Sequence, residues 1–325
     1  MRLPSDLAGV VTEKEPLAPH ASYGVGGSAR WFARPRTREQ LAGLVSCCRD
    51  MGVDLQVLGL GANLLISDDG VNGMVVRLNS PAFREVDWGN DTNGGASPDP
   101  GAGRRGAQDD DVAVTAGGGA DMSRLALDAV RHGLTGLECM AGIPGTLGGI
   151  IRMNAGGRFG DISGVVRDIT VLDLSGRVRK LPREQVGFRY RGSNLEDVII
   201  CSATLILKRG DPNQIRERFL EIWEYKRRSQ PLAEFSAGCV FKNPPGRSAG
   251  ELIDRAGLKG RRVGGASVSD HHANFIVAQE GATAGDILTL IALIRRTVAE
   301  RFGVELELEI EVWGHQPALM DGLIA

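Results

Sequence analysis

Cys239 stands in the segment Phe235-Ser-Ala-Gly-Cys-Val-Phe-Lys-Asn-Pro244, between a glycine and an apolar pair. A thiol in such a place could be a redox centre, a metal ligand, a nucleophile, a proton donor or a packed core residue. The five cysteines of the chain include no Cys-x-x-Cys pair, and their odd number does not suggest a disulfide framework. This argues against a redox or metal site of the Cys-x-x-Cys type, and we expect no metal. An acid, a nucleophile and simple packing remain open.

Glycine-rich tracts are the second feature of the sequence that could take part in binding or catalysis. Glycine makes up 45 of the 325 residues, about twice the usual ~7%. The tracts at 58–63, 112–119 and 141–162 follow or link predicted strands, where backbone N–H groups can point at a phosphate. The Gly-x-Gly-x-x-Gly fingerprint lacks its third glycine at 58–63, and no Gly-Lys-Ser/Thr is present. The tracts therefore indicate either structural turns or a nucleotide cofactor bound without those two motifs.

Strand and helix patterns predict the elements that must position these residues. Helical periodicity predicts helices at 37–52, 121–133, 211–229, 248–257 and 284–302. Apolar or alternating runs predict two strands within 57–66, further strands at 74–78, 112–119, 197–208, 274–279 and 304–313, and a hairpin about Ser175-Gly176. The glutamates of 304–313 alternate with apolar residues, which favours a half-exposed strand with solvated charges. The mixture predicts an α+β or α/β protein of two or three units, with a boundary near residue 210.

Composition and charge argue against several classes of partner. The net charge of −2 and the aromatic content of 5% argue against a nucleic-acid or membrane-surface partner. No run approaches the ~20 apolar residues of a membrane span, and residues 1–16 lack the apolar core of a signal peptide, so we expect a cytoplasmic protein. Residues 88–111 are almost entirely Gly, Asp, Pro, Asn and other non-apolar types, which predicts a disordered insertion.

Short segments that follow one another along most of the chain carry a family resemblance. They are Tyr23–Arg30, Leu58–Leu65, Ala141–Gly149, Met153–Gly156, Tyr190–Ser193, Ser236–Pro244, Ala249–Asp254, Ala256-Gly257, His272–Phe275 and Leu306–Ile310. This ordered set, from about residue 19 to 314, resembles the UDP-N-acetylenolpyruvoylglucosamine reductases. The resemblance is to the shorter form of that enzyme, because no extra loop separates the Tyr-Arg and Ala-Gly-Cys segments.

The resemblance implies a fold, cofactors and a reaction. It implies an FAD-binding portion of the vanillyl-alcohol-oxidase (PCMH) type, made of two α/β subdomains at 19–210, then a C-terminal α/β substrate-binding domain at 211–314 and a tail at 315–325. The implied cofactors are FAD and NADPH. The implied substrate is UDP-N-acetylglucosamine enolpyruvate, which is reduced to UDP-N-acetylmuramate in peptidoglycan precursor synthesis. No oligomeric state is implied.

The same resemblance implies roles for individual residues. The catalytic residues are Arg191, Cys239 and Glu309, with Arg191 stabilising negative charge, Glu309 beside it and Cys239 donating a proton. The substrate residues are Tyr190, Asn243 and either Arg227 or Arg228. The FAD-binding residues are Leu58, Gly59, Gly61, Ala62, Asn63, Leu64, Gly118, Gly142, Ile143, Pro144, Gly145, Gly148, Asn154, Ala155 and Gly156.

Two positions depart from the family pattern. The family usually has a serine where this chain has Cys239, and a thiol is the stronger acid, with a reference pKa of ~8.5. Relatives often carry a lysine where this chain has Ser229, so Arg227 or Arg228 is expected to hold the substrate diphosphate instead. Two rival hypotheses are an FAD oxidase of the same flavin fold and a nucleotide-sugar-binding protein without activity. Arg191 and Glu309 argue against the second.

Overall fold

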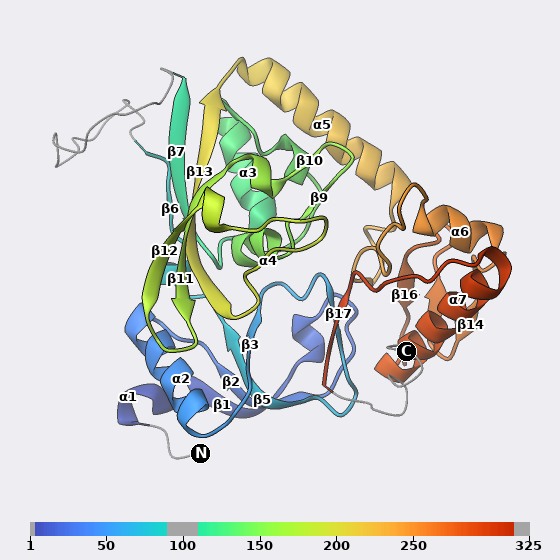
Figure 1. The fold of residues 1–325 in the computed structure, drawn as a ribbon, viewed down its shortest axis with the longest axis horizontal. Helices are drawn as coiled ribbons and strands as arrows, with labels where there is room; N and C mark the ends of the chain where they lie inside the picture. The colour runs from blue at the N-terminus through green and yellow to red at the C-terminus, as the bar shows by residue number, and fades with distance from the viewer. Residues whose placement is uncertain (1–3, 90–109, 315–325) are drawn as a thin grey trace. The chain divides into compact units, whose positions relative to one another are not determined.

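The structure, a computed structural model, describes residues 4–89 and 110–314 (Figure 1). Most of the predicted insertion at 88–111 and the whole predicted tail at 315–325 lie outside the described residues. Packing groups the chain into two compact units, neither of which is continuous in sequence. Unit 1 comprises Met1–Leu7, Arg34–Arg49 and Leu78–Glu224, and unit 2 comprises Ala8–Ala33, Asp50–Arg77 and Tyr225–Ala325. The domain boundary at 210/211 stays a prediction.

Unit 1 is built on an antiparallel sheet in the order β12-β11-β13-β7-β6, with β8 paired to the end of β13. Its strands are β6 (Val86–Asp87), β7 (Asp111–Gly117), β8 (Leu134–Thr135), β11 (Val166–Asp173), β12 (Val178–Pro182) and β13 (Val198–Arg209). β7 and β13 confirm the strands predicted at 112–119 and 197–208. Because β13 lies between β11 and β7, its residues from Ile199 to Leu205 are buried.

Helices α3 (Met122–Arg131) and α4 (Leu147–Arg152) pack with this sheet (Figure 1). Leu125 and Leu147 of the helices share one core cluster with Val171 and Leu205 of the strands. Asp121 caps α3, because its Oδ1 accepts from Arg124 N at 3.0 Å. The remaining elements that begin in unit 1 are α1 (Ser5–Ala8), α2 (Arg38–Asp50), α5 (Pro212–Ser229), β9 (Gly156–Gly157), β10 (Gly160–Asp161), η2 (Pro81–Phe83), η3 (Glu138–Met140), η4 (Ile162–Gly164) and η5 (Arg183–Gln185). Helices α2 and α5 confirm the predictions at 37–52 and 211–229.

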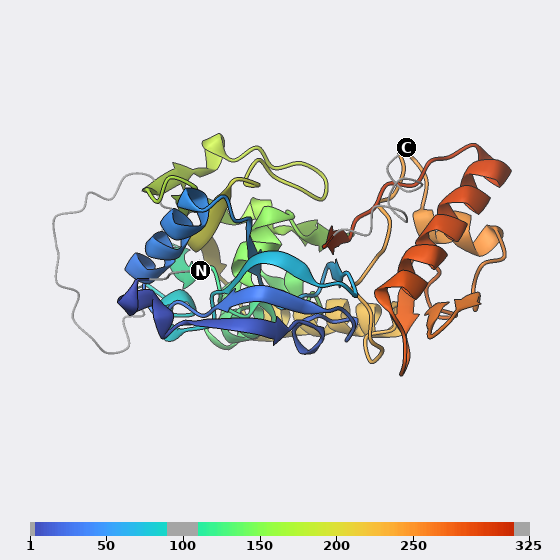
Figure 2. The ribbon, with the colours of Figure 1, turned by 90° about the horizontal axis from the view of Figure 1, so that it is seen from below.

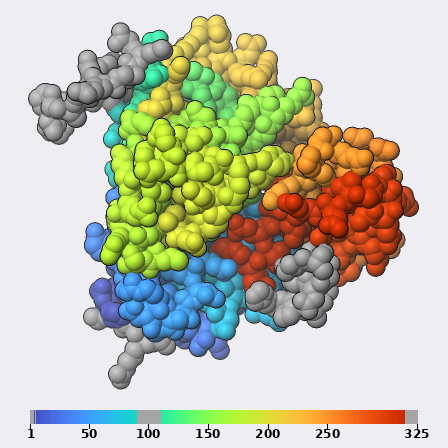
Figure 3. All heavy atoms as spheres, viewed as in Figure 1, coloured from blue at the N-terminus to red at the C-terminus, as the bar shows by residue number. Residues whose placement is uncertain are grey.

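The hairpin predicted about Ser175-Gly176 joins β11 to β12. Oδ1 of Asp173 accepts from the backbone nitrogens of Ser175 (2.9 Å) and Arg177 (3.0 Å), so a single carboxylate organises the turn. Strand β12 is exposed except at Leu181. In the space-filling view, the yellow-green part of the chain that includes this hairpin forms much of the visible face of unit 1 (Figure 3).

Unit 2 contains a four-stranded sheet in the order β1-β2-β5-β3, in which β5 runs parallel to both β2 and β3. The elements of this part are β1 (Val11–Pro16), η1 (Ala18–His20), β2 (Ser28–Ala33), β3 (Leu55–Leu58), β4 (Leu64–Ile66) and β5 (Val71–Arg77). Strands β3 and β4 confirm the two strands predicted within 57–66, with the glycine turn between them. Strand β4 pairs in parallel with β17 (Glu311–Trp313), near the end of the described chain.

The rest of unit 2 consists of α6 (Ala249–Arg255), α7 (Ala284–Phe302) and the small antiparallel sheet β14 (Arg262–Val263), β15 (Ala266–Val268) and β16 (Ile276–Ala278). Helix α7 lies beside α6 and this sheet (Figure 2). Their shared core also takes in Tyr23 and Leu65 from the N-terminal part of the chain. Burial raises the pKa of Tyr23 far above its ordinary value, so this phenol stays neutral.

The strand predicted at 304–313 is wrong over most of its length, because only Glu311–Trp313 forms a strand. The preceding residues bond to a different partner: Lys242 N donates to Glu307 O at 2.9 Å, and Glu309 N donates to Val240 O at 2.8 Å. The chain thus changes its neighbour between Glu309 and Glu311, from the Cys239 segment to β4. Glu309 is also half-buried instead of solvated, as a consequence of that contact.

Asp68 caps α7 from the turn after β4. Its two carboxylate oxygens accept from Ala284 N (2.9 Å) and Gly285 N (3.0 Å), the first two amides of the helix. We expect Asp68→Ala to lower the free energy of unfolding by about 1 kcal/mol, measured by thermal or urea denaturation. The control is the exposed neighbour Asp69, whose replacement by alanine should change it by less than about 0.5 kcal/mol. Equal effects of the two substitutions would contradict the capping role.

Candidate active site

The first predicted cofactor segment is the turn between β3 and β4 in unit 2. It runs from Leu58 to Leu64 and includes all six predicted residues of this tract. At its tightest point Gly61 has φ of +65°, and Ser22 N donates to Gly61 O at 3.1 Å. Among residues 4–89 and 110–314, no acceptor receives the backbone N–H groups of Gly61 and Ala62. Such amides at a turn suit the binding of an anionic group.

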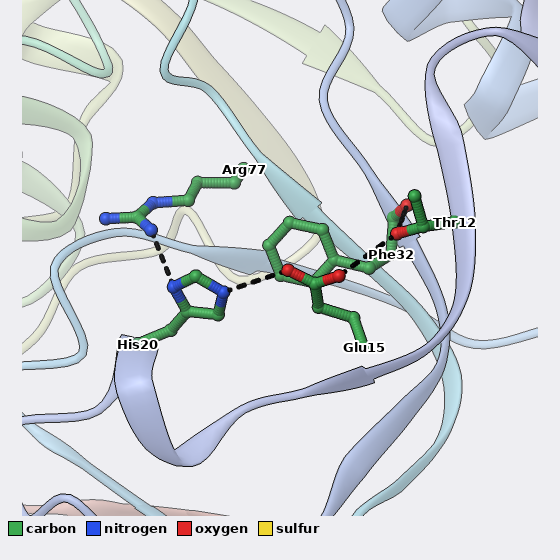
Figure 4. Close-up of polar contacts among 5 residues, drawn as sticks. All are labelled: Thr12, Glu15, His20, Phe32 and Arg77. Carbon is green, nitrogen blue, oxygen red and sulfur yellow. Dashed lines mark hydrogen bonds and ion pairs between the residues drawn. The ribbon is translucent and has the colours of Figure 1, made fainter.

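The backbone of His20 lies directly against this turn at Gly61, and Figure 4 shows the contacts of its side chain. Its ring stacks on Phe32 with centroids 5.2 Å apart. Arg77 Nη1 donates to Nδ1 at 2.7 Å, and Nε2 donates to Glu15 Oε1 at 3.3 Å. Both ring nitrogens therefore have protein partners, which suits a structural role and not a covalent flavin link.

The closeness of His20 to the turn gives a prediction for Gly61. A Cβ at Gly61 would stand 2.2 Å from His20 O, whereas a Cβ at Gly52, with a similar φ of +62°, would meet nothing within 4 Å. Both alanine substitutions carry the left-handed cost of about 1–2 kcal/mol, but only Gly61→Ala adds a clash with rigid backbone. We expect Gly61→Ala to cost about 3 kcal/mol or more and to weaken FAD uptake, with Gly52→Ala as control. Thermal unfolding of the apoprotein and an FAD titration measure the two effects, and equal behaviour would contradict the close approach.

In unit 1, hydrogen bonds bring two other predicted glycine tracts together. Gly148 N donates to Gly118 O at 2.8 Å, and Leu147 N donates to Ala120 O at 2.9 Å. A Cβ at Gly118 would stand 2.0 Å from Ile200 O, so this position accepts only glycine. The stretch Gly142–Gly145, with Ile143 and Pro144, leads directly into this contact, since Met122 N donates to Gly145 O at 2.9 Å.

The third tract in unit 1 contacts the predicted catalytic arginine. Arg191 Nη1 donates to Gly156 O at 2.6 Å, and Asn154 Nδ2 donates to Arg189 O at 3.1 Å. Asn154 (φ +45°) and Arg191 (φ +54°) both occupy the left-handed region, which side chains other than glycine rarely adopt. Residues 154–156 and Arg191 therefore form one strained, mutually bonded group in unit 1, as functional sites often do.

In unit 2, the backbone brings Cys239 and Glu309 into neighbouring segments. Glu309 N donates to Val240 O at 2.8 Å, directly after Cys239, and Phe241 pairs with Leu308. Asn63 Nδ2 donates to Glu309 O at 2.9 Å, which ties the glycine turn to the same place. Three residues predicted from separate segments thus meet in one part of unit 2. Cys239 and Glu309 are both half-buried.

The predicted substrate residues differ in their surroundings. Tyr190 is 57% exposed, and the guanidinium of Arg191 lies 5.4 Å from the centre of its ring. Asn243 Oδ1 accepts from Ala249 N at 2.9 Å, at the start of α6. Arg227 and Arg228 are both exposed near the end of α5.

The sequence analysis did not name Lys226 as a site residue. Its side chain is nevertheless buried, with only 7% of its surface exposed. The signal that could have found it is helical spacing, because Lys226 follows the buried Ile222 by four residues on α5. No group of three or more His, Cys, Asp or Glu side chains in residues 4–89 and 110–314 could hold a metal ion. In the same ranges, no helix has the length and apolar character needed to cross a bilayer.

Comparison with known proteins gives matches over nearly the whole chain. The family model of the C-terminal domain of UDP-N-acetylenolpyruvoylglucosamine reductase matches residues 230–313, and that of an FAD binding domain matches residues 29–182. A UDP-N-acetylenolpyruvoylglucosamine reductase from Heliobacterium modesticaldum is 41% identical over 98% of this chain and 95% of its own length. One from Moorella thermoacetica is 41% identical over 94% of this chain and 93% of its own. The crystal structure of the corresponding reductase from Thermus caldophilus superposes with a TM-score of 0.75 at 37% identity, over 93% of this chain and 98% of that one.

Proposed function

Because the chain belongs to the family of UDP-N-acetylenolpyruvoylglucosamine reductases, we propose specific roles for its residues in that reaction. The enzyme is an FAD-dependent oxidoreductase that uses NADPH to reduce UDP-N-acetylglucosamine enolpyruvate to UDP-N-acetylmuramate, a step of peptidoglycan synthesis. We assign Arg191, Cys239 and Glu309 to the chemical step.

The glycine tracts are proposed to hold FAD. The turn Leu58–Leu64 offers backbone amides at Gly61 and Ala62 for an anionic group, and the tracts at Gly118 and Gly142–Gly148 are bonded to each other. This combination of backbone amides at a tight turn and close backbone packing fits a dinucleotide bound through its phosphates. Asn154, Ala155 and Gly156 complete the set. When bound, FAD supplies the centre that accepts a hydride from NADPH and delivers it to the enolpyruvyl group.

Arg191 and Cys239 are proposed to handle the charge and the proton of this reaction. Addition of hydride to the methylene carbon leaves negative charge on the neighbouring carbon and its carboxylate, which needs a cationic partner and a proton. The fixed guanidinium of Arg191, held by Gly156 O, suits the charge. A thiol is largely protonated at neutral pH by its reference pKa of ~8.5, so Cys239 can give the proton. Glu309, in the segment bonded to Val240, is the third polar group of the step.

We propose that Tyr190 and Asn243 contact the substrate and that Arg227 or Arg228 binds its diphosphate. Their guanidinium groups suit phosphate oxygens, and both side chains are exposed. The partners of the protein are then the two small-molecule substrates, with no nucleic acid and no membrane. We place the reaction in the cytoplasm, and we assign FAD binding to 19–210 and substrate binding to 211–314.

The observation that carries these roles is the backbone bond between Glu309 and Val240, which sets Glu309 beside the Cys239 segment. The test is optical. The purified protein should be yellow, lose its flavin absorbance with NADPH under anaerobic conditions, and regain it when the enolpyruvyl substrate is added. A colourless protein that takes up no FAD would contradict the assignment. A protein bleached by a sugar or alcohol instead of NADPH would favour the oxidase hypothesis.

A further inference from the structure

The side-chain amide of Asn274 binds the backbone of Phe241 in both directions. Its Oδ1 accepts from Phe241 N at 3.0 Å, and its Nδ2 donates to Phe241 O at 2.7 Å. The backbone carbonyl of Asn274 accepts from Val240 N at 2.8 Å. Asn274 and Phe241 are only 3% and 1% exposed, so water does not replace these bonds.

On its other edge, the same segment is bonded to the chain around Glu309. Val240 O accepts from Glu309 N at 2.8 Å, and Lys242 N donates to Glu307 O at 2.9 Å. The stretch Val240–Lys242 therefore behaves as a short strand with a neighbour on each side. On one side the neighbour is ordinary backbone, and on the other it is largely one asparagine side chain. Cys239 comes directly before this stretch, and Asn243 directly follows it.

Asn274 is itself held in place by His272. Nδ1 of His272 accepts from Asn274 N at 3.2 Å, and His272 O accepts from Phe275 N at 2.9 Å. Burial lowers the pKa of His272, which keeps Nδ1 unprotonated and able to accept. The ring also packs edge-on against Phe275, with centroids 4.9 Å apart. The side-chain amide of Asn274 is therefore held in a fixed position against Phe241.

We propose that Asn274 is a positioning residue for the reaction, which sets the place of Cys239 by fixing Val240 and Phe241. This inference rests on the proposed proton-donor role of Cys239. A carboxamide offers a donor and an acceptor side by side at every pH and so mimics the edge of a neighbouring strand. Serine has a single oxygen, and an ionised aspartate only accepts. Shifting the donor by about 1 Å would cost on the order of 10²-fold in rate, as misplaced catalytic groups do.

The test compares Asn274→Asp with the parent enzyme by stopped-flow flavin absorbance. Aspartate keeps the shape and the bond from Phe241 N but loses the bond to Phe241 O. We expect reoxidation by the enolpyruvyl substrate to slow by about 10- to 100-fold, with reduction by NADPH changed less than about twofold. The ratio of variant to parent should recover at lower pH, because a protonated carboxyl can again donate to Phe241 O. His272 is present in both proteins, so the effect of its titration on the rate cancels in the ratio of variant to parent.

A second readout needs no catalysis. Amide hydrogen exchange of Val240–Lys242 and alkylation of Cys239, followed by peptide mass spectrometry, should both speed up at least fivefold in the FAD-free Asn274→Asp protein. Asn274→Leu, which removes both bonds, should do the same without recovery at low pH. The control is Val298→Ala in α7, a fully buried site in the same core. It lowers stability and should leave the reoxidation rate and the pH ratio unchanged.

The outcomes distinguish the role of Cys239 from the role of Asn274. If Cys239→Ala reoxidises at the parent rate, the role of Cys239 is wrong. If Cys239→Ala is slow but both Asn274→Asp and Asn274→Leu match the parent in reoxidation and alkylation, the role of Asn274 is wrong. If Val298→Ala shows the same defects as Asn274→Asp, the effect is one of stability, and the positioning role is likewise overturned.

Discussion

Cys239→Ala should slow the reoxidation of the reduced enzyme by its enolpyruvyl substrate by about 10²–10⁴-fold, the usual contribution of a general acid. Reduction by NADPH should stay nearly unchanged, because no proton from Cys239 is needed in that step. Alanine removes the acid with little loss of volume at a half-buried site, so folding should survive. Stopped-flow measurement of the two half-reactions gives both rates on one sample.

Cys239→Ser is the matched variant for this prediction. Serine keeps a donor of similar size at the same place and is the residue that the family usually has, so much of the activity should return. A serine hydroxyl is a much weaker acid than a thiol. The rate of Cys239→Ser relative to the parent therefore shows whether the acidity of the donor or only its position limits the step. Normal substrate turnover by Cys239→Ala would remove the acid role.

Arg191→Lys should lower the rate of the substrate step by about 10²–10³-fold, the range seen when one charge-stabilising donor is lost. Lysine keeps the charge, but its single ammonium cannot bond Gly156 O and also present the planar donors of a guanidinium. The left-handed backbone at Arg191 is the same for both residues, so the variant tests the side chain alone. The measurement is again the rate of reoxidation, at saturating substrate.

Arg189→Lys is the control for Arg191→Lys. Arg189 lies two residues away and forms an exposed ion pair with Glu196, of the kind that contributes ~0–1 kcal/mol. Its backbone carbonyl, which accepts from Asn154, is untouched by the substitution. We expect less than a twofold change in rate. Similar losses of rate in Arg189→Lys and Arg191→Lys would mean that any arginine of this segment matters equally and that Arg191 has no special role.

Local signals predicted most elements, and they failed where distant residues decide the outcome. Helix α7 and the β11–β12 hairpin follow from periodicity and turn residues, and both were predicted closely. The run 304–313 alternates like a strand, yet its middle bonds to the Cys239 segment, about 70 positions earlier in the chain. Pattern in a window of ten residues cannot reveal such a partner.

In the candidate site, too, local segments could be predicted from the sequence, whereas contacts between distant residues could not. The glycine tracts, Cys239, Arg191 and Glu309 could be named from their segments, because a family resemblance attaches to short stretches. The roles of the residues that support the site and the fold could not be predicted in this way. Asn274 acts on Phe241 across 33 positions, and Asp68 caps α7 across 216. Asn274 does lie in the segment His272–Phe275 that carries part of the resemblance, but nothing in the sequence identifies its partner, and the same holds for Asp68.

The discontinuity of unit 2 has a consequence for how the chain folds during synthesis. Tyr23 and Leu65 share a core with α7, and β4 pairs with β17, so contacts span most of the sequence. Strands β1, β2, β3 and β5 can pair with one another early, but Tyr23, Leu65 and β4 leave the ribosome long before α7 and β17 exist. High contact order of this kind slows folding and prolongs the exposure of unpaired strands. A nascent chain stalled before residue 284 would lack α7 and β17, and would therefore leave exposed apolar surface that the complete chain buries.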